Sequence, residues 1–363
     1  MARMHMTTGT KAKKPIRTFY QEPTKSYSPP KEYNFGELIP HADSGSRASL
    51  IESLIKEHSS TYELMEPHLD PLPYLNKVHA PEYVEALEAC SKKLQESEES
   101  NAWFFPSVFR VNQEFNRQHV QSNKHVGYYA FDTFTPVGEE TFNQASRSAQ
   151  SAVSAMDWML NNNESFAYAL CRPSGHHACH DYFGGYCFFN NAACAAERAL
   201  ETVKKVVILD VDYHHGNGTQ SIYYDRKDVF VINVHADPAK VFPYFAGFED
   251  EVGTGEGEGF NLNIIAEKDI QTHDYVEILE NRVKPALLNF KPDVVIVSLG
   301  VDTAATDPLG DFGLTEDSFE AIGRFIKSIN VPTVTVQEGG YDVASISKYV
   351  HAYMTGYLQG ETA

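Results

Sequence analysis

One short stretch of the chain carries the residue types that bind a catalytic metal ion. It reads Asp210-Val-Asp212-Tyr-His214 and begins at the end of an apolar run. In an extended strand, residues two apart point to the same side, so Asp212 and His214 can reach one ion, and Asp210 shares their face. Asp302 follows a second apolar run and could be a third ligand. Two carboxylates and one imidazole around zinc leave the fourth position open for water, as in a hydrolytic site.

Amide hydrolysis also needs groups that move protons and a donor for the developing oxyanion, and the sequence offers candidates for both. The pair His176-His177 can divide the proton transfers. Tyr341, on the Gly339-Gly340 turn, can donate its phenol hydrogen to a substrate carbonyl. A histidine pair is more often one core and one surface residue, and a Gly-Gly-Tyr turn is usually structural. Their coincidence with the metal-ligand pattern favours a catalytic interpretation.

The elements that must position these residues are predicted from apolar runs and from helical periodicity. Strands are expected at 167–171, 206–211, 229–234, 294–299 and 333–336, and helices at 191–203, 272–288 and 315–328. Continuous apolar strands that alternate with helices predict a single-domain α/β fold, with a mostly parallel multi-stranded sheet and helices on both faces. Ligands bind at the carboxyl ends of the strands in such sheets, and the polar clusters fall there.

Two segments lie outside this pattern. Residues 1–35 are basic and contain several prolines, which predicts an N-terminal tail, and residues 36–360 are expected to form the catalytic domain. A long loop is expected at about 95–126, where aromatic residues such as Trp103 and Phe115 follow a stretch rich in Glu and Ser. These rings could form a homodimer contact, or they could pack on their own domain.

The composition narrows the class of protein. Against 49 Asp and Glu there are 30 Lys and Arg, and the formal charge of −19 should repel nucleic acid and attract cations. The 5 cysteines include no Cys-x-x-Cys pair, which is typical of a reducing compartment. No apolar run approaches the roughly 18 residues of a membrane span, and a signal-peptide pattern is absent. We expect a soluble, cytoplasmic protein that contacts neither nucleic acid nor membrane.

The motifs together resemble those of a known enzyme superfamily. They read RPSGHHA (172–178), FGGYCFFNNAA (183–193), VVILDVDYHHGNGTQ (206–220), VSLGVDTAATDPLG (297–310) and EGGYD (338–342). These motifs are similar to those of the histone deacetylase and acetylpolyamine amidohydrolase superfamily, which has the arginase-deacetylase fold. Within it, the acetylpolyamine amidohydrolases and the class II-like bacterial deacetylases are most similar. The resemblance implies a deacetylase in which Asp212, His214 and Asp302 bind zinc and an N-acetyl amide on a cationic amine is hydrolysed to acetate.

The resemblance also implies roles for the neighbouring residues. His177 would act as general base and acid, and Tyr341 would polarise the carbonyl. His176 would be an electrostatic partner with Asp210 behind it. Asn217 would orient His177, where some relatives carry Asp. An amide stabilises a protonated imidazole less than a carboxylate does.

Structural potassium ions are implied by the same resemblance. The residues implied for a first potassium ion are Asp210, Asp212, His214, Asn233 and Val234, and those implied for a second are Tyr223, Arg226 and Val229.

The resemblance further implies a narrow tunnel for an acylated side chain. Gly185, Tyr186 and Phe245 match its walls, where two facing rings admit a thin methylene chain. Asp132 matches a rim acid that holds substrate backbone amides, although a capping role or a surface position explains it as well.

The sequence leaves the substrate open between an acetylpolyamine and acetyl-lysine in a protein or peptide. The acidic surface does not decide, because polyamines and histone tails are both cations. The polyamine enzymes place an acid before their Gly-Tyr-Tyr sequence, whereas residues 121–129 here read QSNKHVGYY and contain no carboxylate, so selectivity for a second ammonium group is in doubt.

Two other classes of protein compete with the deacetylase. A binuclear manganese ureohydrolase would need more carboxylate and histidine ligands, and a non-catalytic acyl-lysine binder would leave His177 and Tyr341 unexplained.

Overall fold

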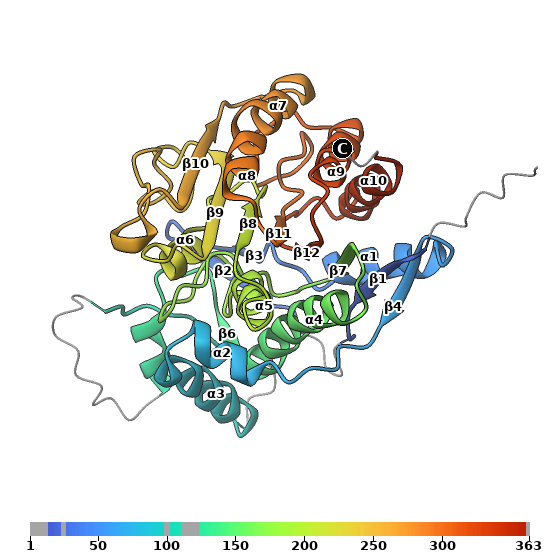
Figure 1. Cartoon of the computed structure of the whole chain (residues 1–363). Coiled ribbons are helices and arrows are strands. Elements are labelled where there is room, and N and C mark those ends of the chain that lie inside the picture. The colour runs from blue at the N-terminus through green and yellow to red at the C-terminus, as the bar shows by residue number, and fades with distance from the viewer. Residues whose placement is uncertain (1–13, 23–26, 98–101, 111–122, 361–363) are drawn as a thin grey trace, which may run out of the picture.

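A computed structural model of the chain describes residues 14–22, 27–97, 102–110 and 123–360. Its centre is an eight-stranded sheet in which neighbouring strands are parallel (Figure 1). In spatial order the strands are β10 (Asn261–Ala266), β9 (Val229–Ala236), β8 (Val206–Asp210), β11 (Val294–Leu299), β12 (Thr333–Gln337), β7 (Phe166–Ala169), β1 (Ile16–Phe19) and β4 (Tyr62–Met65). The predicted parallel α/β sheet is confirmed.

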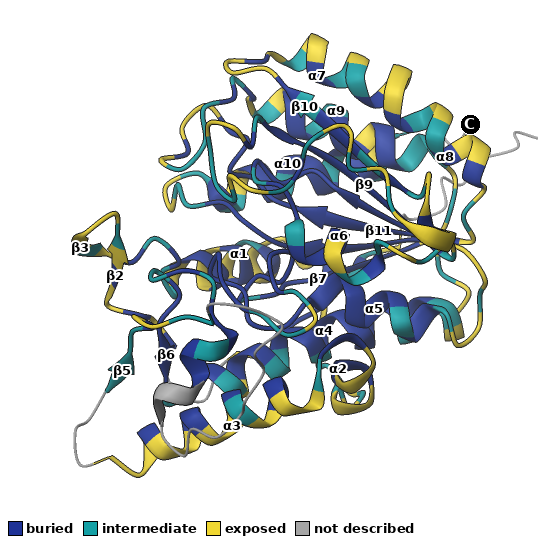
Figure 2. Cartoon of the chain, turned by 90° about the vertical axis from the view of Figure 1, so that its left-hand side faces the viewer, coloured by how far each residue is buried: buried dark blue, intermediate teal, exposed yellow. Residues whose placement is uncertain are grey.

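Helices cover both faces of this sheet, as the two views show (Figures 1 and 2). One face carries α2 (Leu72–Val78), α3 (Pro81–Gln95), α4 (Thr141–Asn161) and α5 (Asn191–Ala199). The other carries α1 (Ser46–Glu57), α7 (Thr272–Ile278), α8 (Lys284–Phe290), α9 (Glu316–Ser328) and α10 (Ile346–Gln359). Successive residues of a strand point to opposite faces of the sheet. Val207 and Leu209 therefore pack in the core on one face, and Val206 and Ile208 in the core on the other.

None of the described helices is long and apolar enough to cross a membrane.

Part of the expected N-terminal tail is a strand of the central sheet. β1 pairs with both β4 and β7, and Phe19 is fully buried. Nearby, β2 (Lys31–Asn34) and β3 (Glu37–Pro40) form an antiparallel hairpin. The prediction of a tail is therefore wrong for β1 and β2, because a strand of four residues is too short to show a pattern among basic residues and prolines. Residues 1–13 and 23–26 lie outside the described residues.

The expected long loop at 95–126 also lies partly outside the described residues. Within it, β5 (Trp103–Phe104) pairs with β6 (Val137–Gly138), and η1 (Asn123–Tyr129) is a 3₁₀ helix. The rings of β5 and of Phe109 pack against the core of their own domain. Phe115 falls among residues that are not described, and the homodimer contact stays a prediction.

The helix predicted at 272–288 is made of three segments. α7 continues into a π-helical turn at Leu279–Val283, and α8 follows directly. Pro285 lies in the first turn of α8 and has no N–H to continue the hydrogen-bond ladder, so a wider turn before it is expected.

Candidate active site

The polar clusters singled out in the sequence meet at the carboxyl ends of four neighbouring strands. β7 leads to the His176-His177 pair, β8 to Asp212 and His214, β11 to Asp302 and β12 to Tyr341. The spatial order β8-β11-β12-β7 places these strand ends side by side. A pocket of about 290 Å³, lined by His177, His214 and Tyr341 among others, opens at this edge of the sheet.

Three side chains gather their ligand atoms around one point. His214 Nδ1 lies 3.0 Å from Oδ2 of Asp302 and 3.4 Å from Oδ1 of Asp212. In a tetrahedral zinc site, ligand atoms about 2.0–2.2 Å from the ion lie roughly 3.3–3.6 Å from one another. The 3.4 Å distance lies in this range and the 3.0 Å distance is slightly shorter, while the donor set of two carboxylates and one imidazole suits a zinc ion.

Main-chain donors hold these side chains in place. Asp212 accepts hydrogen bonds from the N–H of His214 at 2.9 Å and of Gly339 at 2.8 Å, while Asp302 Oδ1 accepts from the N–H of Tyr213 at 3.0 Å. A Cβ at position 339 would lie 2.4 Å from Asp302 Oδ2. Glycine is therefore required there, because any side chain would displace the carboxylate.

Buried acids make this region strongly negative. Asp210, Asp212, Asp302 and Glu338 are all buried. Burial, together with the charge of Asp212, raises the pKa of Asp302 to about 7, and burial also raises the pKa of Glu338 to about 7. Carboxylates crowded away from water repel one another unless cations neutralise them. A bound cation would thus stabilise this part of the fold.

His176 is held between carboxylates. Its Nδ1 lies 2.9 Å from Oδ2 of Asp210, and its main-chain N–H donates to Oε2 of Glu338 at 3.2 Å. Burial opposes protonation of this imidazole, but the charges of Asp212 and Asp210 raise its pKa well above the usual range. Sequence reasoning assigned no role to Glu338, although it opens the EGGYD motif.

His177 has a different partner and a different protonation state. Its Nδ1 lies 2.7 Å from Oδ1 of Asn217, whose amide nitrogen donates to the sulfur of Cys179. Because an amide oxygen can only accept, the proton of His177 lies on Nδ1 and Nε2 carries a lone pair. Burial, followed by the neighbouring His176 and His214, lowers the pKa of His177 well below its usual range. The imidazole is therefore neutral at pH 7.

Tyr341 lies on the turn after β12 and lines the pocket. Its ring centroid lies 5.7 Å from that of Tyr186, and the guanidinium of Arg47 stacks over the ring at 4.6 Å. Arg47 also donates to the carbonyl oxygens of Gly340 and, at 2.8 Å, of Glu338. Burial raises the pKa of Tyr341 well above its usual range, so the phenol keeps its proton at neutral pH. Sequence reasoning missed Arg47, which lies in α1, far along the chain and outside every motif.

The aromatic wall of the pocket is only partly the predicted one. Gly185 and Tyr186 line it, but Phe245 is 92% exposed and does not. Phe242 lines the wall instead, and its ring centroid lies 4.8 Å from that of His177. The assignment of Phe245 is wrong because spacing along a loop does not reveal which of two nearby phenylalanines turns inward.

Asp132 is buried rather than exposed at the rim. Its Oδ2 accepts from the N–H of Gly185 at 2.6 Å, and its Oδ1 accepts from the N–H of Phe134 at 3.1 Å. Both carboxylate oxygens thus bind the chain's own backbone. Asp132 therefore fixes the turn that carries Gly185, and its role as a substrate-binding rim acid stays a prediction.

The burial of Asp132 predicts a dependence of stability on pH. Burial raises its pKa from 3.8 to about 7, so between pH 4 and 7 the folded protein holds a proton that the unfolded chain releases. The stability contributed by Asp132 is therefore greatest at low pH and falls as pH rises through this window. We expect the unfolding free energy of wild type, measured relative to that of Asp132→Asn, to be about 3 kcal/mol higher at pH 4 than at pH 7. Denaturant unfolding of both proteins measures this difference, and a pH-independent difference would contradict it.

Gly185 packs directly on the imidazole of His177. It has φ +57°, and a Cβ there would lie 2.3 Å from Cδ2 of His177. Gly185→Ala should therefore displace the ring and lower kcat by about tenfold to a hundredfold. Gly255→Ala is the matched control, since φ is +58° and no atom of the described residues beyond its chain neighbours lies within 4 Å of the added methyl group. Both should lose about 1–2 kcal/mol from backbone strain, but only the first should lose activity. Equal activities would show that the ring position is unimportant.

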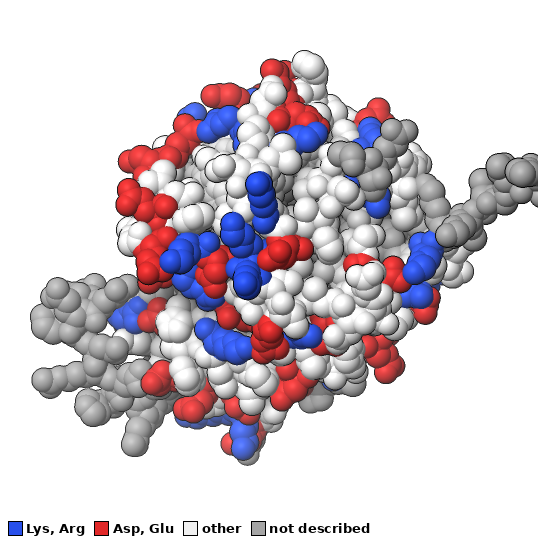
Figure 3. All heavy atoms as spheres, in the orientation of Figure 1, with Lys and Arg blue, Asp and Glu red and all other residues white. Residues whose placement is uncertain are grey.

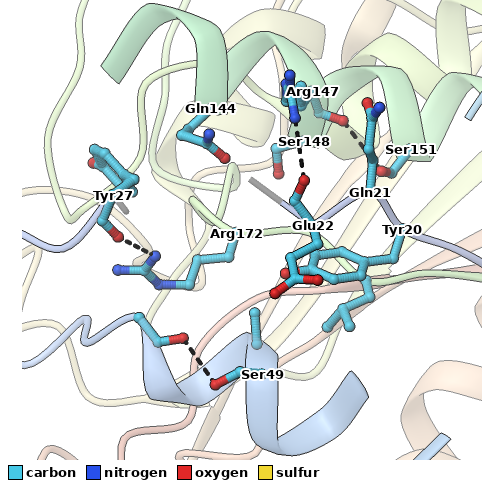
Figure 4. Close-up of a pocket in the computed structure, with 13 residues that line it drawn as sticks. Tyr20, Gln21, Glu22, Tyr27, Ser49, Gln144, Arg147, Ser148, Ser151 and Arg172 are labelled. Carbon is cyan, nitrogen blue, oxygen red and sulfur yellow. Dashed lines mark hydrogen bonds between the residues drawn. The ribbon is translucent and has the colours of Figure 1, made fainter. Parts of the chain in front are cut away.

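A second cavity, of about 320 Å³, lies beside Arg172 (Figure 4). Its walls include Tyr20, Tyr27 and Gln144. The guanidinium of Arg172 donates to the carbonyl oxygen of Tyr27 at 2.7 Å and to Oδ1 of Asp43 at 2.9 Å. None of the candidate metal ligands lines this cavity, so the candidate reaction site is the pocket at the strand ends.

Comparisons with known proteins agree with this geometry. Residues 41–357 match the family described as histone deacetylase domain. The acetylpolyamine amidohydrolase of Mycoplana ramosa is 36% identical over 345 residues, covering 94% of this chain and 99% of that protein. Acetylpolyamine amidohydrolase 2 of Pseudomonas aeruginosa is 34% identical, covering 91% of this chain and 95% of that protein. A crystal structure of acetylpolyamine aminohydrolase from Burkholderia pseudomallei superposes with a TM-score of 0.87 at 31% identity, covering 94% of this chain and 98% of that one. This chain therefore belongs to the histone deacetylase domain family.

Proposed function

We propose that this protein is a zinc-dependent amide hydrolase that removes an acetyl group from an acylated amine. The observation that carries the proposal is the meeting of three zinc-type ligand atoms with the imidazole of His177 and the phenol of Tyr341 at one pocket. Asp212, His214 and Asp302 would hold the zinc. When bound, zinc acts as a Lewis acid toward the amide carbonyl and the attacking water.

His177 would carry the protons. With its own proton fixed on Nδ1 by Asn217, it presents an unprotonated Nε2 that can take a proton from the water. The same Nε2 can then deliver that proton to the nitrogen of the departing amine. His176, protonated beside Asp210, would supply a fixed positive charge next to His177, at 4.0 Å between ring centroids.

Tyr341 would stabilise the oxyanion. Its phenol keeps its proton, so it can donate a hydrogen bond to the carbonyl oxygen as negative charge develops there. Arg47 would fix the ring by stacking on it and by binding two carbonyl oxygens of the same turn. Because Arg47 contacts the ring and the turn, we class it as a positioning residue.

We also propose the potassium sites that the family resemblance implies. The buried acids around Asp210 and Asp212 support a further cation there, since carboxylate and carbonyl oxygens suit a hard ion. At the first site the Oδ1 of Asn233 accepts from the N–H of Gly216 at 3.1 Å. The second site would use the turn at 223–229, where the N–H of Arg226 donates to the carbonyl oxygen of Tyr223 at 3.0 Å.

Location and assembly are also proposals. The five cysteines are all free, which supports a reducing, cytoplasmic compartment. Asp and Glu spread over the face seen in Figure 3, mixed with Lys and Arg. This mixture and the net charge of −19 support the expectation that nucleic acid is not a partner. A homodimer through residues 95–126 is proposed from the sequence alone.

Acetate release tests the proposed reaction. We expect the zinc-loaded protein to release acetate from an acetyl-lysine peptide or from an acetylated polyamine, and a chelator-treated sample to release none until zinc is restored. If neither kind of substrate releases acetate with zinc present, the proposed amide hydrolase activity is rejected. Saturable binding of the acetyl-lysine peptide without release would instead favour an acyl-lysine binder.

A further inference from the structure

We propose that Lys240 sets the substrate class of this pocket by selecting acylated amines whose remaining part is neutral, as in an acyl-lysine side chain of a polypeptide. A lysine loses its charge when it is acylated, whereas a monoacetylated polyamine keeps at least one ammonium group. The inference rests on the proposed function and names the substrate class of the same site.

The charged residues that line the pocket disfavour a second ammonium group on the substrate. Its buried end is formed by His177, His214 and Tyr341, and its open end by residues that include Phe35, Tyr244 and Lys240. Among the described residues that line it, Lys240 is the sole lysine or arginine, and none is an aspartate or glutamate. A second ammonium group at the open end would therefore face a cation rather than a carboxylate.

The positive charge of Lys240 is only partly neutralised by nearby acids. It follows β9 in the segment Asp237-Pro-Ala-Lys240, and its side chain is 74% exposed. Its Nζ lies 2.9 Å from Oδ2 of Asp237, which does not line the pocket. Glu267 and Asp311 also act on this ammonium group from a longer range, and none of the three acids lines the pocket. Exposed charge pairs of this kind are weak, so these acids neutralise the field of Lys240 only in part. Like charges brought together at a binding site weaken binding and slow association.

Aromatic rings at the open end offer a surface for apolar parts of the substrate. Phe35, between the two strands of the β2–β3 hairpin, is 85% exposed, and its ring centroid lies 6.4 Å from that of Tyr244, which is 36% exposed. The ring of Phe245 lies a further 6.4 Å from Tyr244 and is nearly fully exposed. Exposed rings beside a pocket mark a binding surface, because they gain free energy when apolar groups cover them. The methylenes and neighbouring residues of an acylated lysine offer such groups.

Lys240 and the aromatic rings select the same class of substrate. The rings favour a remainder of the substrate that offers apolar surface, and Lys240 disfavours a cationic one. The overall charge of −19 attracts polyamines and basic peptides alike, so the local charge at the pocket decides between them.

A pair of small substrates that differ in one group tests the inference. N-Acetylputrescine carries an ammonium group where the isosteric N-pentylacetamide carries a methyl group, and an acetyl-lysine peptide serves as a third substrate. We expect wild type to show kcat/KM about tenfold higher for N-pentylacetamide than for N-acetylputrescine. Lys240→Glu should raise kcat/KM for N-acetylputrescine about tenfold or more, with less than a twofold change for N-pentylacetamide.

Lys348→Glu is the matched control. Lys348 lies in α10, its side chain is 59% exposed, it forms an exposed ion pair with Glu316 at 2.6 Å, and it does not line the pocket. Both substitutions change the net charge equally, so a general effect of charge would appear in both variants. The effect of Lys240→Glu should also shrink as ionic strength rises.

The outcomes separate this inference from the proposed function. If wild type hydrolyses N-acetylputrescine as fast as its neutral isostere, or if the Lys240 and Lys348 variants behave alike, the inference is overturned and the amide hydrolase stands. If none of the three substrates releases acetate from the zinc-loaded protein, the proposed function fails, and this inference fails with it.

Discussion

Asp302→Asn is expected to abolish zinc retention and to lower acetate release by at least about a thousandfold. The carboxylate of Asp302 supplies one of the three ligand atoms, 3.0 Å from Nδ1 of His214. An amide of the same shape keeps an oxygen for the N–H of Tyr213 but loses the negative charge that a dication requires. Metal analysis after gel filtration should give about one zinc per wild-type chain and less than about a tenth in the variant.

Asp311→Asn is the matched control for this change. Asp311 is a partly exposed acid that accepts a hydrogen bond from the phenol of Tyr213 at 2.8 Å, and it is outside the three-ligand cluster. Full zinc content and near-normal activity are expected there. An Asp302→Asn protein that keeps its zinc would contradict the ligand assignment. Two manganese ions per wild-type chain would favour the ureohydrolase instead.

The candidate site was predictable from sequence because its parts are local. Asp212 and His214 are two residues apart after a strand, so the period of an extended chain already places them on one side. Tyr341 and the histidine pair follow other apolar strands, and parallel strands end at the same edge of the sheet. These residues meet at one pocket because their strands are neighbours in the sheet, so no contact between distant segments had to be predicted.

The features that were missed depend on contacts between distant segments. Arg47 reaches the Tyr341 turn from α1 by folding alone, and nothing in the residues around it signals a contact with a tyrosine ring. β1 contributes only four residues and is stabilised by pairing on both edges, which no local pattern records. Phe242 shows the same limit within a loop, where the direction of a side chain depends on backbone geometry rather than on spacing.

Tyr341→Phe is expected to lower kcat by about 10²–10³-fold while KM changes little. The substitution removes one oxyanion donor, and a hydrogen bond that strengthens only as charge develops contributes to the transition state rather than to substrate binding. The ring remains, so its stacking with Arg47 and its contact with Tyr186 should keep the fold and the pocket intact. Zinc content should also stay at the wild-type value, because the phenol is not part of the three-ligand cluster.

Tyr353→Phe separates the loss of a catalytic hydroxyl from the loss of any buried one. Tyr353 is fully buried, and its hydroxyl lies 2.9 Å from that of Thr335, away from the pocket. Its variant should lose about 1 kcal/mol of stability and keep its kcat. If Tyr341→Phe keeps full activity, the carbonyl must be polarised without the phenol. The position of this ring beneath Arg47 would then need another explanation.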